Sequence, residues 1–171
     1  AWWTFRIYGL PAPRVLDGGL DAWIAAGGTL ESGPSAPPTP VAPPELTWNA
    51  SLYADEAAVA AALADDATTV VDARAAARFA GAAPEPRAGL RAGHMPGAAN
   101  LPFTALLDAV GRIIPNADSF AGPTIATCGS GVSACVLALS AAAAGAPDVA
   151  IYDGSWSEWG REDGPEVATG A

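Results

Sequence analysis

Short β-branched runs alternate with alanine-rich segments along residues 47–171, and this alternation limits the possible folds more than any other feature of the sequence. The runs that we expect to form strands are 68–71, 124–127 and 150–152. The segments that we expect to form helices are 55–63 and 131–144. Strands that alternate with helices form a parallel sheet covered on both faces, so the sequence predicts an α/β fold. Such sheets place their chemistry at the carboxyl ends of strands, where Asp72 and Cys128 follow two of the runs.

The two predicted helices rest on different signals. Asp55 and Glu56 put negative charge in the first turn of the first segment, where the helix dipole favours it. Val59 and Leu63 then stand four residues apart on one face. In the second segment, the apolar side chains that we expect to face the core follow the helical spacing: Val132, Cys135, Val136 and Leu139.

One pattern occurs twice in the chain. Residues 15–19 and 151–155 each contain an apolar pair followed by Asp-Gly, and a tryptophan follows each aspartate by six residues. Asp17 and Asp153 stand 136 residues apart. Each copy predicts a short buried strand, a tight turn and a short helix whose tryptophan folds back. Coincidence is the alternative, because Asp-Gly turns are common.

A segment rich in Gly, Ser and Pro separates the two copies. Residues 28–46 show neither helical nor strand periodicity, which predicts an extended linker. We therefore expect residues 1–27 to be the C-terminal remnant of a first domain and residues 47–171 to be a second domain, which the resemblance described below implies to be the catalytic one. The first 27 residues carry more apolar and aromatic side chains than so short a piece can bury alone. We expect them to pack on a missing first-domain segment or on the second domain.

The charge of the chain excludes several classes of partner. Eight arginines and no lysine stand against 18 acidic residues, which gives a net charge of −10. A surface this acidic does not attract phosphate backbones or anionic lipids, so we expect no nucleic-acid and no membrane partner. The sequence has no long apolar run, and its first ten residues lack the order of a signal peptide. A cytoplasmic location is therefore expected.

The chain has two cysteines, Cys128 and Cys135, and a single histidine, His94. If both cysteines lie on one helix, seven residues separate them by ~10 Å along its axis, which is too far for a disulfide. Free thiols fit a reducing compartment. One histidine and two cysteines also make a poor zinc site, so we expect neither a metal nor another cofactor.

The segment 128–133 follows a predicted strand and opens a predicted helix. Gly129 and Gly131 permit a tight turn, and the backbone N–H groups of such a turn can surround an anion. A thiol at the N-terminus of a helix ionises more readily, which makes Cys128 the candidate nucleophile. A buried cysteine at a strand end is the alternative. Cys135 shares the expected apolar face, so we expect it to be a core side chain.

A cysteine in a strand-to-helix loop also serves tyrosine-phosphatase-like enzymes. These enzymes need an arginine six residues after the cysteine to clamp the phosphoryl group. Ala134 stands at that position, and the loop has no other base, so the bidentate partner is absent. The small and hydroxylic side chains of the loop instead suit a small charged sulfur species held by backbone groups, which points to sulfur transfer.

Three motifs resemble the tandem rhodanese family, and specifically its 3-mercaptopyruvate sulfurtransferase branch. They are GHMPGAANLPF at 93–103, CGSGVSA at 128–134 and YDGSWSEWG at 152–160. The resemblance extends over 47–165, and residues 1–28 resemble the last third of the family's first, non-catalytic domain. It implies a rhodanese-like domain, in which helices flank a parallel sheet and the active-site loop lies between a strand and a helix.

The resemblance also implies roles for individual residues. Arg78 and Arg87 match two arginines that hold the carboxylate and carbonyl of mercaptopyruvate, and guanidinium is the best fork for a carboxylate. Surface arginines that solvate a loop are the alternative. Ser130 matches a catalytic relay whose histidine and aspartate belong to the family's first domain and lie outside this sequence. The other loop residues expected to contact the donor are Gly129, Gly131, Val132 and Ser133.

Several nearby residues are expected to be structural. His94 belongs to a turn that is structural in the family, so we do not expect it to be a general base. Arg74 and Arg91 match no substrate-holding position and are candidates for ion pairs. Trp156 and Trp159 are expected to pack under the loop that follows the last strand.

Together these features predict a sulfurtransferase without a cofactor. Sulfur would pass from 3-mercaptopyruvate through a Cys128 persulfide to cyanide or to a thiol, such as thioredoxin or a low-molecular-weight thiol. Thiosulfate is the alternative donor, but thiosulfate-preferring members carry basic residues where this chain has Gly129 and Ser130. A rhodanese-like binding module whose cysteine does not turn over is the alternative from another class.

Overall fold

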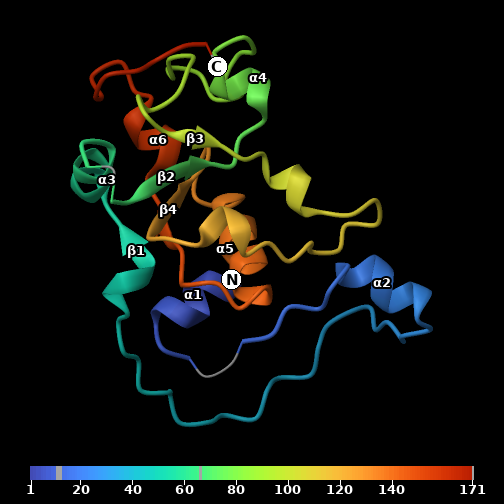
Figure 1. Ribbon diagram of the computed structural model, residues 1–171. Helices are drawn as coiled ribbons and strands as arrows, with labels where there is room; N and C mark the ends of the chain where they lie inside the picture. The colour runs from blue at the N-terminus through green and yellow to red at the C-terminus, as the bar shows by residue number, and fades with distance from the viewer. Residues whose placement is uncertain (11–12, 66, 171) are drawn as a thin grey trace.

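The computed structural model of the chain describes residues 1–10, 13–65 and 67–170. A parallel sheet with the strand order β1-β5-β4-β2-β3 forms its centre (Figure 1). The strands are β1 (Tyr53–Ala54), β2 (Thr69–Asp72), β3 (Ala99–Asn100), β4 (Thr124–Thr127) and β5 (Ala150–Tyr152). The three predicted strands are confirmed, with β2 beginning one residue later than expected. The sequence did not reveal β1 and β3, which are too short to show a period.

The order of the strands reverses between β2 and β4. These two strands pair over four residues, from Thr69 opposite Thr124 to Asp72 opposite Thr127. The chain leaves β2 toward its other neighbour β3, whereas it leaves β4 toward β5. In parallel α/β sheets such a reversal opens a crevice at the carboxyl ends of the strands. The residues that follow β2 and β4 therefore meet at a natural binding site.

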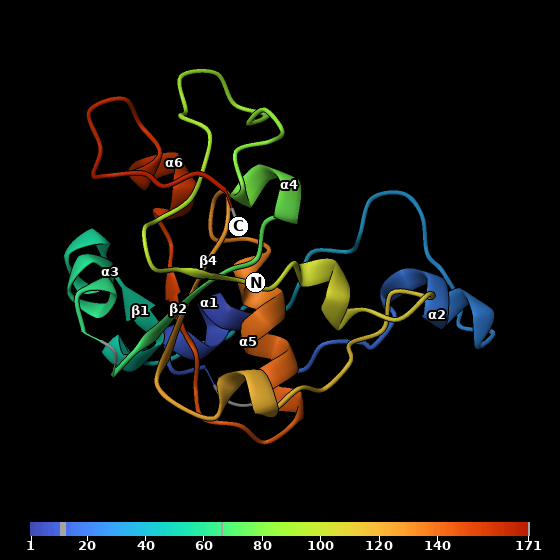
Figure 2. The same cartoon turned by 45° about the horizontal axis from the view of Figure 1, so that its top comes forward.

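Helices cover both faces of the sheet (Figures 1 and 2). On one face, α5 packs with α1 against Val71, Ala126 and Ile151. On the other face, α3 and α6 pack against Val70 and Ile125. The helices are α1 (Trp2–Ile7), α2 (Gly19–Ala25), α3 (Glu56–Leu63), α4 (Ala76–Phe79), α5 (Ala134–Ala143) and α6 (Ser155–Trp159). Among the described residues, no helix combines the length and the apolar character needed to cross a bilayer.

The first predicted helix is confirmed and the second is shifted. Asp55 caps α3 by accepting a hydrogen bond from the N–H of Ala58 at 2.8 Å. The second helix, predicted over 131–144, begins only at Ala134. Its predicted apolar face is wrong, because Val132 is 76 % exposed and the buried positions are Ala134, Leu137, Ala138, Ser140 and Ala141. Almost every residue of α5 is apolar, so periodicity alone could not fix which face meets the sheet.

Helix α1 packs on the domain that carries the sheet. Ile7 is buried, the Trp3 Nε1–H donates to the Leu52 carbonyl at 3.0 Å, and Arg6 pairs with Asp148 at 2.7 Å. Trp2 and Trp3 also contact the core beneath α5. Helix α1 therefore packs on residues of the predicted second domain, one of the two partners expected for the first 27 residues. Residues 28–46 form neither helix nor strand, as expected of a linker.

Candidate active site

Cys128 directly follows β4, and residues 128–133 form the loop that leads into α5. The Cys128 side chain is almost fully buried. Gly131 turns the chain with a φ of +74°, and a Cβ at this position would lie 2.9 Å from the Asp153 Oδ1 atom. Only glycine meets both conditions without strain. Ser133 is the N-cap residue of α5, so the loop ends at the positive end of the helix dipole.

The first turn of α6 holds the loop from the side of β5. The Ser155 Oγ accepts hydrogen bonds from the N–H groups of Cys128 at 3.2 Å and Gly131 at 2.9 Å, and it donates to the Tyr152 carbonyl at 2.7 Å. The backbone N–H of Trp156 donates to the Cys128 carbonyl at 3.0 Å. Ser155 is fully buried and has a φ of +51°, which is strained for a serine. Sequence reasoning missed Ser155, and its only signal is its place after an Asp-Gly turn at the end of β5.

The loop also supplies backbone N–H donors beside Cys128. The Ser130 N–H points at the Cys128 Sγ, with an N-to-S distance of 3.5 Å. Within the described residues, no group accepts a hydrogen bond from the N–H of Gly129, Val132 or Ser133. Donors that are held in place before the reaction can stabilise negative charge as it develops on sulfur.

A pocket of about 410 Å³ opens beside Cys128. The residues that line it are Arg78, Pro86, Arg87, Cys128, Gly129, Ser130, Val132 and Ser133. The structure therefore brings both predicted arginines together with the predicted nucleophile and most of the predicted loop. Gly131 differs from the others, because it lies outside this lining and its N–H already donates to Ser155. Its role in the structure is to turn the chain.

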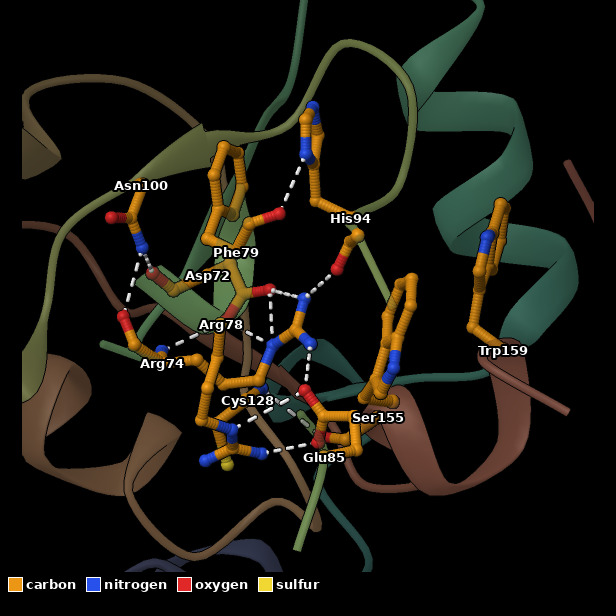
Figure 3. Close-up of polar contacts among 12 residues, drawn as sticks. Asp72, Arg74, Arg78, Phe79, Glu85, His94, Asn100, Cys128, Ser155 and Trp159 are labelled. Carbon is orange, nitrogen blue, oxygen red and sulfur yellow. Dashed lines mark hydrogen bonds and ion pairs between the residues drawn. The ribbon is translucent and has the colours of Figure 1, made fainter. Parts of the chain in front are cut away.

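A buried ion network fixes Arg78 at the pocket (Figure 3). Arg78 donates from Nε to Glu85 Oε1 at 3.2 Å and from Nη2 to Glu85 Oε2. Glu85 also pairs with Arg74 at 2.8 Å, and Arg74 pairs with Asp72 at 2.7 Å. The charges alternate along this chain of four, so each buried ion has a partner of opposite sign. The predicted ion pairing of Arg74 is confirmed, whereas Glu85 was not singled out from the sequence.

Arg87 reaches the pocket from an exposed position. Its Nη1 donates to the Gly129 carbonyl at 3.3 Å and to the Ser157 Oγ. The two arginines are therefore held differently, Arg78 by a buried carboxylate and Arg87 by neutral groups. An anion that enters the pocket competes with fewer charged partners for Arg87 than for Arg78.

Four neighbours of the site are structural, and the expectation for one of them, Arg91, is wrong. His94 stacks on Phe79 with 3.8 Å between ring centroids, and its Nδ1 lies 2.9 Å from the Phe79 carbonyl, which confirms its structural role. Trp156 and Trp159 are buried and donate to backbone carbonyls, as expected of packing residues. Arg91 was expected to form an ion pair, but its Nη2 donates to two backbone carbonyls instead. These carbonyls belong to Trp159, the last residue of α6, and to Pro165, and among the described residues no carboxylate pairs with Arg91.

The second cysteine has the properties of a packing residue. Cys135 is half-buried in α5, and its Sγ donates to the Gly131 carbonyl at 3.3 Å. Burial raises the pKa of the Cys135 thiol to about 11, so it is protonated near neutral pH. Both cysteines are free thiols, and Cys128 lies outside α5. In the part of the chain that the structure describes, no cluster of three or more His, Cys, Asp or Glu side chains is arranged to hold a metal ion.

A model of the rhodanese-like domain family matches residues 55–162. The chain belongs to this family. It is 41% identical over 180 residues to human 3-mercaptopyruvate sulfurtransferase, covering 96% of this chain and 58% of that protein. It is also 41% identical over 177 residues to rat thiosulfate sulfurtransferase, covering 97% of this chain and 59% of that protein.

Solved structures agree with the rhodanese-like fold predicted from the sequence. The crystal structure of SseA from Escherichia coli, described as a 3-mercaptopyruvate sulfotransferase, superposes with a TM-score of 0.73 at 33% sequence identity. That match covers 92% of this chain and 61% of the other. This rhodanese-like chain thus spans about three fifths of the length of the relatives that it matches.

Proposed function

We propose that this chain carries the catalytic centre of a sulfurtransferase that takes sulfur from 3-mercaptopyruvate, with Cys128 as the nucleophile. One observation carries the proposal: the Cys128 thiol, the free loop N–H groups and two arginines share a single pocket. The pocket therefore combines a group that attacks sulfur with groups that bind an α-keto acid. Relatives that are 41% identical and are named for this activity support the same assignment.

The first half-reaction forms a persulfide. Arg78 and Arg87 bind the carboxylate and carbonyl of the donor and align its sulfur with Cys128. The Cys128 thiolate attacks that sulfur, so an S–S bond forms while the C–S bond of the donor breaks. The electron pair of the broken bond passes to carbon and gives the enolate of pyruvate, which takes up a proton and leaves as pyruvate.

The loop stabilises the charge that moves through this step. The N–H groups of Gly129, Val132 and Ser133 are the free donors, and Ser130 already donates to the Cys128 Sγ. We also assign a catalytic role to the Ser130 hydroxyl, because the residue lines the same pocket as the thiol. Gly131 contributes by shaping the loop.

The second half-reaction returns the free enzyme. A thiolate or cyanide attacks the outer sulfur of the Cys128 persulfide, the S–S bond breaks and Cys128 leaves as a thiolate. The product is a new persulfide or thiocyanate. We propose a low-molecular-weight thiol or thioredoxin as the thiol acceptor, in a cytoplasmic setting.

Thiosulfate is the second candidate donor. The chain is as similar to a thiosulfate sulfurtransferase as to a 3-mercaptopyruvate sulfurtransferase. Thiosulfate has no carboxylate for the two arginines to bind as a fork. Gly129 and Ser130 also add no positive charge beside the sulfur, so we assign mercaptopyruvate as the better donor.

Arginine variants test the donor assignment. Arg78→Ala and Arg87→Ala should each lower kcat/KM for mercaptopyruvate by about tenfold to a few hundredfold, since a charge-assisted hydrogen bond contributes about 1.5–3 kcal/mol. Pyruvate release and thiocyanate formation measure the rate. The matched control is Arg161→Ala, whose exposed side chain forms its one ion pair within the described residues with exposed Asp163.

The two donors separate the possible outcomes. We expect thiosulfate to be affected less than mercaptopyruvate in both variants. Equal rates with mercaptopyruvate in the wild type and both variants would contradict the substrate assignment. A wild-type chain that transfers sulfur from neither donor would favour the binding module.

A further inference from the structure

The Gly129 carbonyl lies at the centre of a cluster of hydrogen bonds that the reaction scheme does not use. It accepts from the Ser157 N–H at 3.0 Å, from the Ser157 Oγ–H and from the Arg87 Nη1 at 3.3 Å. Arg87 Nη1 also donates to the Ser157 Oγ. This carbonyl therefore accepts three hydrogen bonds, two from Ser157 in α6 and one from the cationic Arg87.

The same peptide unit carries the N–H of Ser130. A trans peptide is planar, and its C=O and N–H bonds point in opposite directions. Because the Gly129 carbonyl is directed at Ser157, the Ser130 N–H is directed away from it. That N–H points at the Cys128 Sγ at 3.5 Å. The side chain of Ser157 thus helps to fix the direction of a donor that it does not touch.

The donors on the carbonyl also change the strength of the N–H. Hydrogen bonds to a carbonyl polarise the amide, and a charged donor does so more than a neutral one. The polarised N–H becomes a better donor to a thiolate or to a sulfur that gains charge. Ser157 is half-buried and lies in α6, whose carboxyl-terminal half is anchored by buried Trp159, so its position is fixed by the fold.

We propose that Ser157 is a positioning residue for sulfur transfer: with Arg87, it orients and polarises the Gly129–Ser130 peptide so that the Ser130 N–H stabilises negative charge on the Cys128 sulfur. Arg87 then has two roles: it binds the sulfur donor, and it holds the Gly129 carbonyl of the loop. The catalytic consequence rests on the proposed function. The effect on the sulfur of Cys128 does not depend on which sulfur donor the chain uses.

Replacement of Ser157 leaves the other charged groups around the site in place. We expect Arg78 to stay paired with Glu85 and the Asp153 carboxylate to stay beside Gly131. Cys135 stays protonated below pH 9, because burial raises its pKa to about 11. A change in the alkylation of Cys128 would therefore report on the peptide and on Arg87.

The experiment compares Ser157→Ala with Ser157→Thr in the full chain. Alkylation of Cys128 by iodoacetamide is followed as a function of pH, and sulfur transfer is measured with mercaptopyruvate and with thiosulfate. For Ser157→Ala we expect the alkylation midpoint to rise by roughly half a pH unit, and transfer from both donors to fall about three- to tenfold, the scale of one ordinary hydrogen bond. Ser157→Thr keeps the hydroxyl and should restore both. Ser119→Ala, an exposed serine outside the pocket, is the matched control.

Each result decides the proposal. A wild-type alkylation midpoint in Ser157→Ala would overturn it, and so would a loss confined to mercaptopyruvate, which would limit Ser157 to holding Arg87 for the carboxylate. A shifted midpoint in a chain that transfers no sulfur would support the positioning role and reject the proposed function. Thermal melting is measured for every variant. If Ser157→Ala does not fold, Ser157→Cys, with a weaker donor, should show an intermediate shift, and a wild-type midpoint there would overturn the proposal.

Discussion

Two copies of one sequence pattern have different structures in this chain. Both copies form a turn at Asp-Gly and then a short helix, which begins two residues after Asp17 in α2 and two residues after Asp153 in α6. The apolar pair before the turn forms β5 in the second copy, whereas residues 15 and 16 belong to no helix or strand. The strand that we predicted for the first copy is therefore wrong. Trp159 is 3 % exposed, but Trp23 is 43 % exposed.

The difference lies in the neighbours of each copy. Strand β5 lies between β1 and β4 and pairs with both, so both of its edges are hydrogen-bonded. Its side chains are buried in the core clusters on both faces of the sheet. Among the described residues, no strand pairs with residues 15 and 16. Local chemistry is thus enough for a turn and a helix, but a strand forms only where a sheet supplies its partners. The second copy, whose strand joins the sheet, also holds the Cys128 loop in place.

The largest difference between the copies should appear in their tryptophans. Trp159→Ala removes a buried ring and the hydrogen bond from its Nε1 to the Glu166 carbonyl, and should lower the free energy of unfolding by about 3–5 kcal/mol. Trp23→Ala, in the exposed copy, should lower it by less than about 1 kcal/mol. Urea unfolding followed by far-UV circular dichroism measures both. Equal losses would show that the first copy is packed as firmly as the second.

The next largest difference is expected between substitutions at the residues that follow the two Asp-Gly turns, Ser155 and Gly19. Ser155→Ala leaves the buried N–H groups of Cys128 and Gly131 without their acceptor, which should cost about 1–3 kcal/mol of stability and slow sulfur transfer by roughly tenfold. The equivalent position in the first copy is Gly19, and the comparison variant there is Gly19→Ser. It places a side chain in open space at a φ of +63°, so it should cost about 1 kcal/mol and leave transfer unchanged. A normal transfer rate in folded Ser155→Ala would remove Ser155 from the account of the loop.

The smallest effect should come from Tyr152, which occupies the position of Leu16 in the first copy. Burial, together with the hydrogen bond to Glu158 at 2.7 Å, raises the pKa of Tyr152 well above its usual range. The folded chain therefore keeps the phenolic proton that the unfolded chain releases above about pH 10, so stability falls as the pH rises beyond that value. Relative to Tyr152→Phe, the wild type should lose stability between pH 10 and pH 11. Parallel stability curves would show that Tyr152 titrates equally in both states.

The sequence predicted the parts of the fold that depend on local signals. The β-branched runs of β2 and β4 and the capped start of α3 were all visible in the sequence. The buried face of α5 was not, because alanines on every side give no period. Short strands such as β1 depend on pairing with β5, which lies about a hundred residues away along the chain.

The candidate site also contains some residues that the sequence could indicate and others that it could not. Cys128 could be proposed as the nucleophile from its place between a predicted strand and a glycine-containing loop, whereas Arg78 and Arg87 were proposed because they match the family motif. Glu85, Ser155 and Ser157 could not, because each acts through another residue that only the fold brings near. Their own residue types occur at many surface positions, so no local pattern distinguishes them.

Intact-mass spectrometry after brief exposure to 3-mercaptopyruvate tests the central claim most directly. The wild type and Cys135→Ser should each gain the mass of one sulfur atom, about 32 Da, and lose it on addition of cyanide. Cys128→Ser should gain nothing, because burial raises the pKa of the Cys135 thiol and keeps it protonated. A sulfur adduct on Cys128→Ser, or its absence from Cys135→Ser, would place the reactive sulfur elsewhere and contradict the account.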